Sequence, residues 1–326
     1  MLLEHLRSWL QINEMKETPM EILGAPISSV GAAVKGWAVV LADLVKVRLT
    51  TLVLLTMLVG FYFGCRGPVN FALMWHTLAA TALVAAGAAA LNQFLERDYD
   101  AKMRRTQNRP LPSGRMQPAT AMLFGVVCSV AGLVYLASAV NLLTAVIGAI
   151  SLISYLFIYT PLKRLTWLNT AIGAVPGALP PLMGWTAARG ELSSEGWVLF
   201  AILAFWQMPH FMAIAWIYRD DYAKAGFKML PNVDPDGCRT GQQAVSHALA
   251  LLLVSLSPFL FKMAGPVYLV SAIVLGVVFL WSAIQFSRQL RFAQAEPALI
   301  RARLLFLVSI LYLPLLLGVM VLDKVK

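Results

Sequence analysis

The sequence predicts an all-α membrane protein with about nine transmembrane helices. Of its 326 residues, 59% are hydrophobic and only 13% are charged, whereas soluble domains carry roughly 25% charged residues. Apolar runs of about 20 residues, the length that crosses the hydrocarbon layer, recur along the chain. Because lipid offers the backbone no hydrogen bonds, these runs should be helices. The alternating pattern of a β-barrel is absent.

The expected spans follow one another with mostly short connections. They cover residues 42–64, 70–91, 118–138, 141–159, 166–188, 197–217, 243–263, 266–286 and 303–322. Residues 1–41 are expected to form a cytoplasmic segment, and residues 42–326 the membrane domain. The N-terminal run is interrupted by charges and carries four glutamates, which argues against a secretory signal or an organellar transit peptide. A bacterial plasma (inner) membrane is therefore the expected location.

The basic residues predict the orientation. Nearly all of the 26 lysines and arginines lie in the N-terminal part, through the first residues of the first span, or in the even-numbered connections. The exceptions are Arg66, Arg189, Lys262, Lys324 and Lys326. By the positive-inside rule, the N-terminus is cytoplasmic and the C-terminus lies outside. The same rule explains the net charge of +10, so we expect no nucleic-acid partner.

Acidic residues gather after the second and the sixth span. The two groups are Glu96, Asp98 and Asp100, and Asp220, Asp221, Asp234 and Asp236. Both are expected on the cytoplasmic side, four spans apart. This spacing predicts two four-helix halves with a ninth helix added, and a site where the halves face each other.

The first group has the spacing of one helix face. Asn92, Glu96 and Asp100 stand at i, i+4 and i+8, while Asp98 falls on the opposite face. Oxygen ligands of this kind suit Mg²⁺, which typically takes one or two carboxylates together with phosphate oxygens. The alternative is a solvated helix end held by ion pairs four residues apart.

Basic and aromatic residues near the acids are candidates for binding pyrophosphate, since guanidinium groups donate paired hydrogen bonds to phosphate. They are Lys102, Arg105, Arg109, Tyr159, Lys163, Arg164 and Lys224. The positive-inside rule alone would also place basic residues here, but it does not account for the acids beside them. Pro161 should break the helix, so that Tyr159 and Lys163 are presented from a turn.

Two further features leave alternatives open. Asp220 and Asp221 precede Lys224 and could complete a cation site, or Asp220 and Lys224 could form an ordinary exposed pair. His210 lies inside the sixth span after Pro209 and is either functional or a neutral structural imidazole. The runs GFYFG and GAVPG have the spacing of close helix packing. The cysteines Cys65, Cys128 and Cys238 show no metal-binding spacing.

Together these motifs resemble the UbiA-type intramembrane prenyltransferase superfamily, and within it the protoheme IX farnesyltransferases. The resemblance rests on NQFLERDYDAKMRRTQNRPLPSG, YTPLKR, NTAIGAVPGALPPLMGW, FWQMPHF and YRDDYAKAGFKMLP. It covers the chain from the first span to the loop after the sixth. The superfamily's first motif, N-x-x-x-D-x-x-x-D, is present with Glu96 in its middle position. The second, D-x-x-x-D, is replaced by the adjacent pair Asp220 and Asp221.

The resemblance implies nine helices around a central cavity and transfer of a farnesyl group from farnesyl pyrophosphate to a vinyl group of haem b, giving haem O for a terminal oxidase. A haem A synthase or an oxidase assembly factor would be the partner. Mg²⁺ would be held by Asn92, Glu96, Asp100 and one of the adjacent aspartates, with Asp221 preferred. His210 would orient or ligate the haem iron, or only brace the helix. An aromatic acid acceptor, a transporter and a non-catalytic haem-handling protein are the alternatives.

Overall fold

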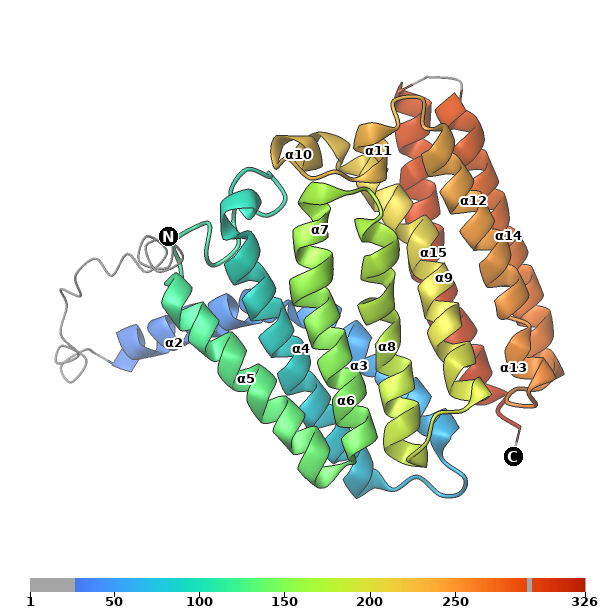
Figure 1. The fold of residues 1–326 in the computed structure, drawn as a ribbon, viewed down its shortest axis with the longest axis horizontal. Coiled ribbons are helices and arrows are strands. Elements are labelled where there is room, and N and C mark those ends of the chain that lie inside the picture. Colours follow the sequence, from blue (N-terminus) through green and yellow to red (C-terminus); the bar gives the residue numbers. More distant parts are fainter. Residues whose placement is uncertain (1–26, 292–294, 326) are drawn as a thin grey trace. The chain divides into compact units, whose positions relative to one another are not determined.

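The computed structural model describes residues 27–291 and 295–325, and these residues are predominantly helical. Within these ranges there is no β-strand, only an isolated antiparallel bridge between Ala264 and Lys324. The chain divides into two compact units, Met1–Leu41 and Ala42–Lys326. All helices from α3 onward, which Figure 1 labels, belong to the second unit. Most of the predicted cytoplasmic segment, residues 1–26, lies outside the described residues.

The described elements are α2 (Ile27–Leu44), α3 (Val47–Gly64), α4 (Phe71–Asp100), α5 (Pro118–Ala139), α6 (Leu142–Ile153), the π-helix η2 (Ser154–Tyr159), α7 (Thr160–Leu165), α8 (Asn169–Arg189), α9 (Ser194–Ile217), α10 (Arg219–Lys224), α11 (Leu230–Val233), α12 (Cys238–Val254), α13 (Ser257–Leu260), α14 (Pro266–Arg291) and α15 (Ala295–Leu322).

Eight helical segments of the described chain are long and apolar enough to cross a membrane, and each matches a predicted span. The remaining predicted span, 166–188, corresponds to α8, which is not among these eight. It carries Pro176, Pro180 and Pro181, and most of its side chains are buried against other helices. A helix enclosed by protein does not need a lipid-compatible surface. The chain is thus a multi-pass membrane protein, and the count of nine spans stays a prediction.

Small residues let α3 and α8 approach closely. A Cβ atom on Gly60 would overlap the carbonyl group of Pro181, and one on Gly184 would overlap the carbonyl group of Met57. Gly173 likewise leaves room for the ring of Tyr159. The glycine runs therefore serve helix packing, as the sequence predicts.

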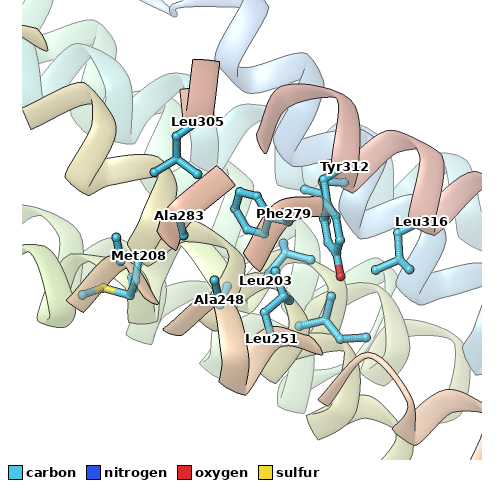
Figure 2. Close-up of a cluster of buried hydrophobic side chains, with 14 of the residues drawn as sticks. Leu203, Met208, Ala248, Leu251, Phe279, Ala283, Leu305, Tyr312 and Leu316 are labelled. Atoms are coloured by element: carbon cyan, nitrogen blue, oxygen red, sulfur yellow. The ribbon is translucent and has the colours of Figure 1, made fainter. Parts of the chain in front are cut away.

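The larger hydrophobic core lies among α9, α12, α14 and α15. Figure 2 shows Phe279 beside Tyr312 in this core, and their stacked rings are 5.1 Å apart. The hydroxyl groups of Tyr312 and Ser255 are hydrogen-bonded at 2.8 Å, which satisfies the polar end of a fully enclosed ring. A second cluster joins α4, α5, α6 and α8. These two cores fix the helices whose ends carry the polar motifs.

Two helices differ in length or regularity from the sequence prediction. Helix α4 continues to Asp100, nine residues beyond the predicted end of its span, so the first acidic group lies on the helix. The segment before Pro161 is not a turn, which corrects the prediction. The chain passes from α6 through the π-helix directly into α7, and Pro161 falls in the first turn of α7, where a missing N–H is tolerated.

Candidate active site

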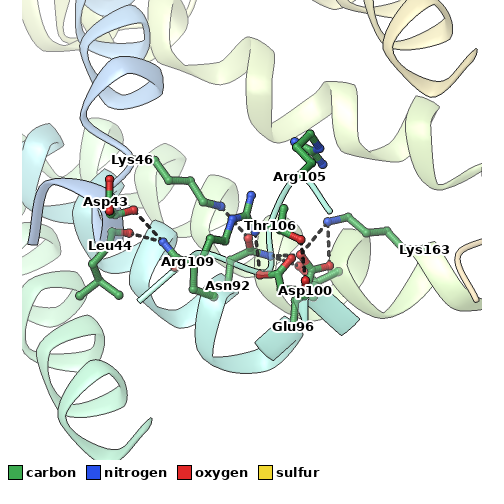
Figure 3. Close-up of polar contacts among 12 residues, drawn as sticks. Asp43, Leu44, Lys46, Asn92, Glu96, Asp100, Arg105, Thr106, Arg109 and Lys163 are labelled. Atoms are coloured by element: carbon green, nitrogen blue, oxygen red, sulfur yellow. Dashed lines mark hydrogen bonds and ion pairs between the residues drawn. The ribbon is translucent and has the colours of Figure 1, made fainter. Parts of the chain in front are cut away.

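The last turns of α4 present three polar side chains on one buried face. Asn92, Glu96 and Asp100 are all buried, whereas the side chain of Asp98 is 79% exposed. Figure 3 shows the three buried groups side by side and surrounded by basic residues. The face-sharing expected from the spacing is therefore present, and Glu96, not Asp98, occupies the middle position.

Glu96 is hydrogen-bonded to Lys163, which lies on α7. Nζ of Lys163 donates to both carboxylate oxygens of Glu96, at 2.7 and 3.0 Å. The ammonium group also lies 4.6 Å from the ring centre of Tyr159, a cation–π distance. Nδ2 of Asn92 donates to Glu96 at 3.1 Å and to the Thr160 hydroxyl at 3.2 Å. The π-helix and α7 thus supply one wall of the site.

Asp100 is held by the loop that follows α4. Nη1 of Arg109 donates to Oδ2 of Asp100 at 2.7 Å, and the Thr106 hydroxyl donates to the Asp100 main-chain carbonyl at 2.8 Å. Oδ1 of Asp100 is buried and accepts no hydrogen bond from the described residues. A buried carboxylate oxygen without a donor is costly, so this atom is a candidate for binding a ligand.

Lys46 completes the surroundings of the triplet from the start of α3. Its backbone is left-handed, with φ 51° and ψ 54°, a conformation that is uncommon for residues other than glycine. This turn brings Nζ to 2.8 Å from Oδ1 of Asn92. Although the residue as a whole is half-buried, burial of its ammonium group, with Arg109 nearby, lowers the pKa of Lys46 to about 7.

The second acidic group meets the first loop at the same end of the bundle. The backbone N–H of Arg105 donates to Oδ2 of Asp221 at 3.4 Å, and its guanidinium donates to the Tyr222 hydroxyl at 3.3 Å. An open cleft of about 530 Å³ lies here. Its lining residues are Arg104, Arg105, Ile217, Tyr218, Asp220, Asp221 and Lys224. The side chain of Asp220 is 89% exposed, so Asp221 is the aspartate in contact with the first loop.

The segment after α10 is tied to the wall that carries Lys163. The backbone N–H of Lys228 donates to the Lys163 carbonyl at 2.7 Å, and Nδ2 of Asn169 donates to the Lys228 carbonyl at 3.0 Å. The rings of Phe227 and Tyr99 lie 5.6 Å apart. These contacts hold α4, α7 and the segment after α10 together at one end of the bundle, where Figure 1 shows α7, α10 and α11.

Some predicted site residues lie apart from the buried triplet. Lys102 and Arg164 are both exposed, and both pack against the outer residue Tyr99. Asp234 of the second acidic group accepts hydrogen bonds from the backbone and the hydroxyl of Thr240, at 2.7 and 2.8 Å. It thereby satisfies the first turn of α12, a structural use of a carboxylate. His210 lies deeper in α9.

The donor set suits a hard divalent cation. Within the described ranges no three His, Cys, Asp or Glu side chains are placed together for a metal. Nevertheless, Oδ1 of Asp100 has no hydrogen-bond donor among the described residues. Glu96 and the side-chain oxygen of Asn92 lie on the same helix face. Carboxylate and amide oxygens are the ligands that Mg²⁺ prefers, and this ion leaves other positions for water and phosphate. The residues therefore fit such an ion.

Sequence reasoning missed Lys46 and Thr160 as members of this cluster. Lys46 counted only toward the orientation signal, because a basic residue before an apolar span is ordinary. Its contact with Asn92 depends on the left-handed turn before α3, which no spacing rule predicts. Thr160 stands within YTPLKR, so its place beside Tyr159 and Lys163 was the available signal.

Comparison with known proteins identifies the family. The UbiA prenyltransferase family matches residues 53–317. Protoheme IX farnesyltransferase from Solibacter usitatus is 49% identical over 291 residues, covering 86% of this chain and 97% of the relative. A solved structure of digeranylgeranylglyceryl phosphate synthase has a TM-score of 0.73 at 16% identity, covering 88% of this chain and 98% of that one.

A second solved structure shares the fold. A UbiA homologue from Archaeoglobus fulgidus bound to DMAPP and Mg²⁺ has a TM-score of 0.59 at 16% identity, covering 83% of this chain and 98% of that one. The region that the family model matches, residues 53–317, runs from α3 into α15 and includes both acidic groups and the cleft. The chain belongs to the UbiA prenyltransferase family.

Proposed function

We propose that this chain transfers a farnesyl group from farnesyl pyrophosphate to haem b; its relative from Solibacter usitatus is named protoheme IX farnesyltransferase. The observation that carries the proposal is the set of basic side chains around the buried polar triplet of α4. Three basic side chains contact the triplet: Lys46, Arg109 and Lys163. Such a set can neutralise a pyrophosphate while the acids hold a divalent cation.

The triplet Asn92, Glu96 and Asp100 would hold the divalent cation, with Asp221 reaching it from the second loop. A bound Mg²⁺ ion supplies positive charge that stabilises the departing pyrophosphate. Two of the acids are already neutralised by protein cations, since Lys163 pairs with Glu96 and Arg109 pairs with Asp100. Each cation is therefore within reach of phosphate oxygens that approach the same carboxylates.

The pyrophosphate would lie between the triplet and the cleft. Arg109 and Lys163 would bind the oxygens nearest to the acids, and Arg105 and Lys224 those toward the cleft. Lys102 and Arg164 are placed farther out on Tyr99 and would attract the anion before it binds. These groups stabilise the charge that forms as the allylic C–O bond breaks.

The protein needs no nucleophile for this reaction. Loss of pyrophosphate leaves an allylic carbocation, which the electron-rich vinyl group of haem b attacks, forming the new C–C bond. Water then adds to the resulting cation and releases a proton, which gives the hydroxyethyl group of haem O. The task of the protein is to orient both substrates and to keep other water away from the allylic cation.

The orientation of the chain is part of the proposal. The basic residues cluster at the end of the bundle that carries the acids, so this end would face the cytoplasm of a bacterial cell, in its inner membrane. The pyrophosphate group of the substrate is charged and hydrated, so it would enter the cleft from the cytoplasmic side. The isoprenoid tail would lie among the apolar helices.

The test compares Asp100 with its exposed neighbour. Purified protein in lipid nanodiscs is given farnesyl pyrophosphate, haem b and Mg²⁺, and haem O is measured by mass spectrometry. Asp100→Asn should abolish haem O formation, whereas Asp98→Asn, on the exposed face, should retain it. The same assay offers 4-hydroxybenzoate as a competing acceptor. Farnesylation of that acid without haem O would refute the choice of acceptor, and normal activity of Asp100→Asn would refute the role of the triplet.

A further inference from the structure

His210 lies on α9, before Ile217, the residue of this helix that lines the cleft. Its hydrogen bonds indicate which ring nitrogen carries the proton. Nδ1 is 2.7 Å from the hydroxyl oxygen of Ser309 on α15. That hydroxyl in turn donates to the Phe306 carbonyl at 2.6 Å. A serine hydroxyl has one proton to give, so its oxygen accepts from His210. The imidazole is therefore protonated at Nδ1, and Nε2 keeps its lone pair.

The ring is also held in one orientation. It stacks on Trp206 at a centroid distance of 4.9 Å and lies 5.0 Å from the ring of Phe306. Nε1 of Trp206 donates to the Ser309 carbonyl at 2.8 Å, which ties the same two helices together. A hydrogen bond from the far nitrogen that fixes ring and tautomer is the arrangement found behind metal-binding histidines.

Nε2 has no hydrogen-bond partner among the described residues, and His210 is half-buried. A histidine that merely braces two helices needs its Nδ1 contact alone and gains nothing from an accessible, unprotonated Nε2. That atom is a good ligand for a transition metal such as haem iron.

A stripe of half-exposed side chains connects this atom with the cleft. Trp206, His210, Ile214 and Ile217 fall on one face of α9 and are all half-buried, while the residues on either side of the stripe include fully buried ones. Ile217 lines the cleft beside Asp221. His210 is seven residues before Ile217, about 10 Å along the helix. A flat, largely apolar macrocycle lying against this stripe would have its edge directed at the pyrophosphate end.

We propose that Nε2 of His210 is an axial ligand of the haem b iron, and that this bond positions the vinyl group of the acceptor for attack on the farnesyl carbon. The inference rests on the proposed function for the identity of the acceptor. His210 contacts the substrate iron, while Ser309 acts through His210 as a positioning residue.

The test separates the iron from the rest of the macrocycle. Haem b and metal-free protoporphyrin IX are titrated into the full chain in nanodiscs, without farnesyl pyrophosphate, and ferric haem is followed by absorption and electron paramagnetic resonance. The wild type should show a nitrogen-ligated ferric haem and bind haem b more tightly than protoporphyrin IX. In His210→Ala this preference should vanish, with the binding of protoporphyrin IX unchanged. Ser309→Ala should weaken haem b binding on the order of tenfold.

Two controls make the outcome specific. His247→Ala removes another half-buried histidine, on α12, whose Nδ1 contacts the Gln243 carbonyl, and should leave haem binding unchanged. Added imidazole should restore the nitrogen-ligated spectrum in His210→Gly. Equal weakening of both macrocycles in His210→Ala, or a wild-type spectrum without a nitrogen ligand, would overturn the proposal. If the wild type ligates haem but forms no haem O, the proposed function fails and the ligand assignment stands.

Discussion

Removing one partner of the buried ion pair in the candidate site should destabilise the protein far more than removing one partner of an exposed pair of similar length. Nζ of Lys163 and Oε1 of Glu96 are 2.7 Å apart, with side-chain exposures of 11% and 6%. Nη2 of Arg66 and Oε1 of Glu191 are 2.6 Å apart, with exposures of 70% and 53%. The two pairs therefore differ in burial and hardly at all in distance.

Removing one partner from each pair should lower the free energy of unfolding by different amounts. Lys163→Met leaves the Glu96 carboxylate enclosed with only the Asn92 amide as a donor. An uncompensated buried charge of this kind costs about 3–5 kcal/mol. Arg66→Gln removes a pair that water screens, for which the expected loss is at most about 1 kcal/mol. Glu96→Gln should resemble Lys163→Met, because it strands the ammonium group instead.

Reversible unfolding in mixed detergent micelles measures the free energies of unfolding. The double variant Glu96→Gln with Lys163→Met should be less destabilised than the sum of its single variants by about 2 kcal/mol or more, since neither charge is then stranded. A coupling energy below about 0.5 kcal/mol between the changes at Glu96 and Lys163 would show that burial does not determine the cost of breaking this pair. Equal losses in the free energy of unfolding for Lys163→Met and Arg66→Gln would show the same.

Three further predictions concern packing, metal and orientation. Gly184→Leu should prevent stable packing of α3 on α8, because its first side-chain atom meets the Met57 carbonyl. The free energy of unfolding should fall by about 3 kcal/mol or more. Gly67→Leu, with nothing near its Cβ position, is the control in the same unfolding assay. Chelation with EDTA should stop haem O formation reversibly yet leave the unfolding midpoint almost unchanged, because lysine and arginine already neutralise the acids; a large fall in the midpoint would contradict this. The exposed Cys238 should react with an impermeant maleimide only after cells are permeabilised, and labelling of intact cells would reverse the proposed orientation.

The arrangement of the triplet could be predicted from the sequence because helix geometry is local. Asn92, Glu96 and Asp100 recur at every fourth position, and that interval alone places them on one face and Asp98 on another. The spans were predictable for a similar reason, since lipid imposes an apolar surface on any helix that faces it. Helix α8 departs from this rule because other helices, not lipid, cover it.

The partners of the triplet depend on tertiary structure and could not be predicted. Lys46 reaches Asn92 across 46 positions of sequence, through a left-handed turn that its own residue type disfavours. The pairing of Lys163 with Glu96 spans 67 positions and depends on how α6, the π-helix and α7 direct the side chain. Composition indicates that bases and acids share a membrane face, but not which base meets which acid.

The π-helix of Ser154–Tyr159 has a consequence for how sequences of this kind can change. Its wider turn, in which the backbone N–H of Thr160 reaches the Tyr155 carbonyl five residues earlier, equals one residue inserted into an α-helix. Deleting one residue would restore an ordinary α-helix and leave the hydropathy of the span almost unaltered. Because the wide turn already accommodates the extra residue, Thr160 and Lys163 would still face Asn92 and Glu96. The same deletion in the regular helix α6 would instead rotate everything beyond it by about 100°. The segment Ser154–Tyr159 can therefore lose one residue and keep the charged site, whereas the loss of one residue from α6 would turn Thr160 and Lys163 away from the acids.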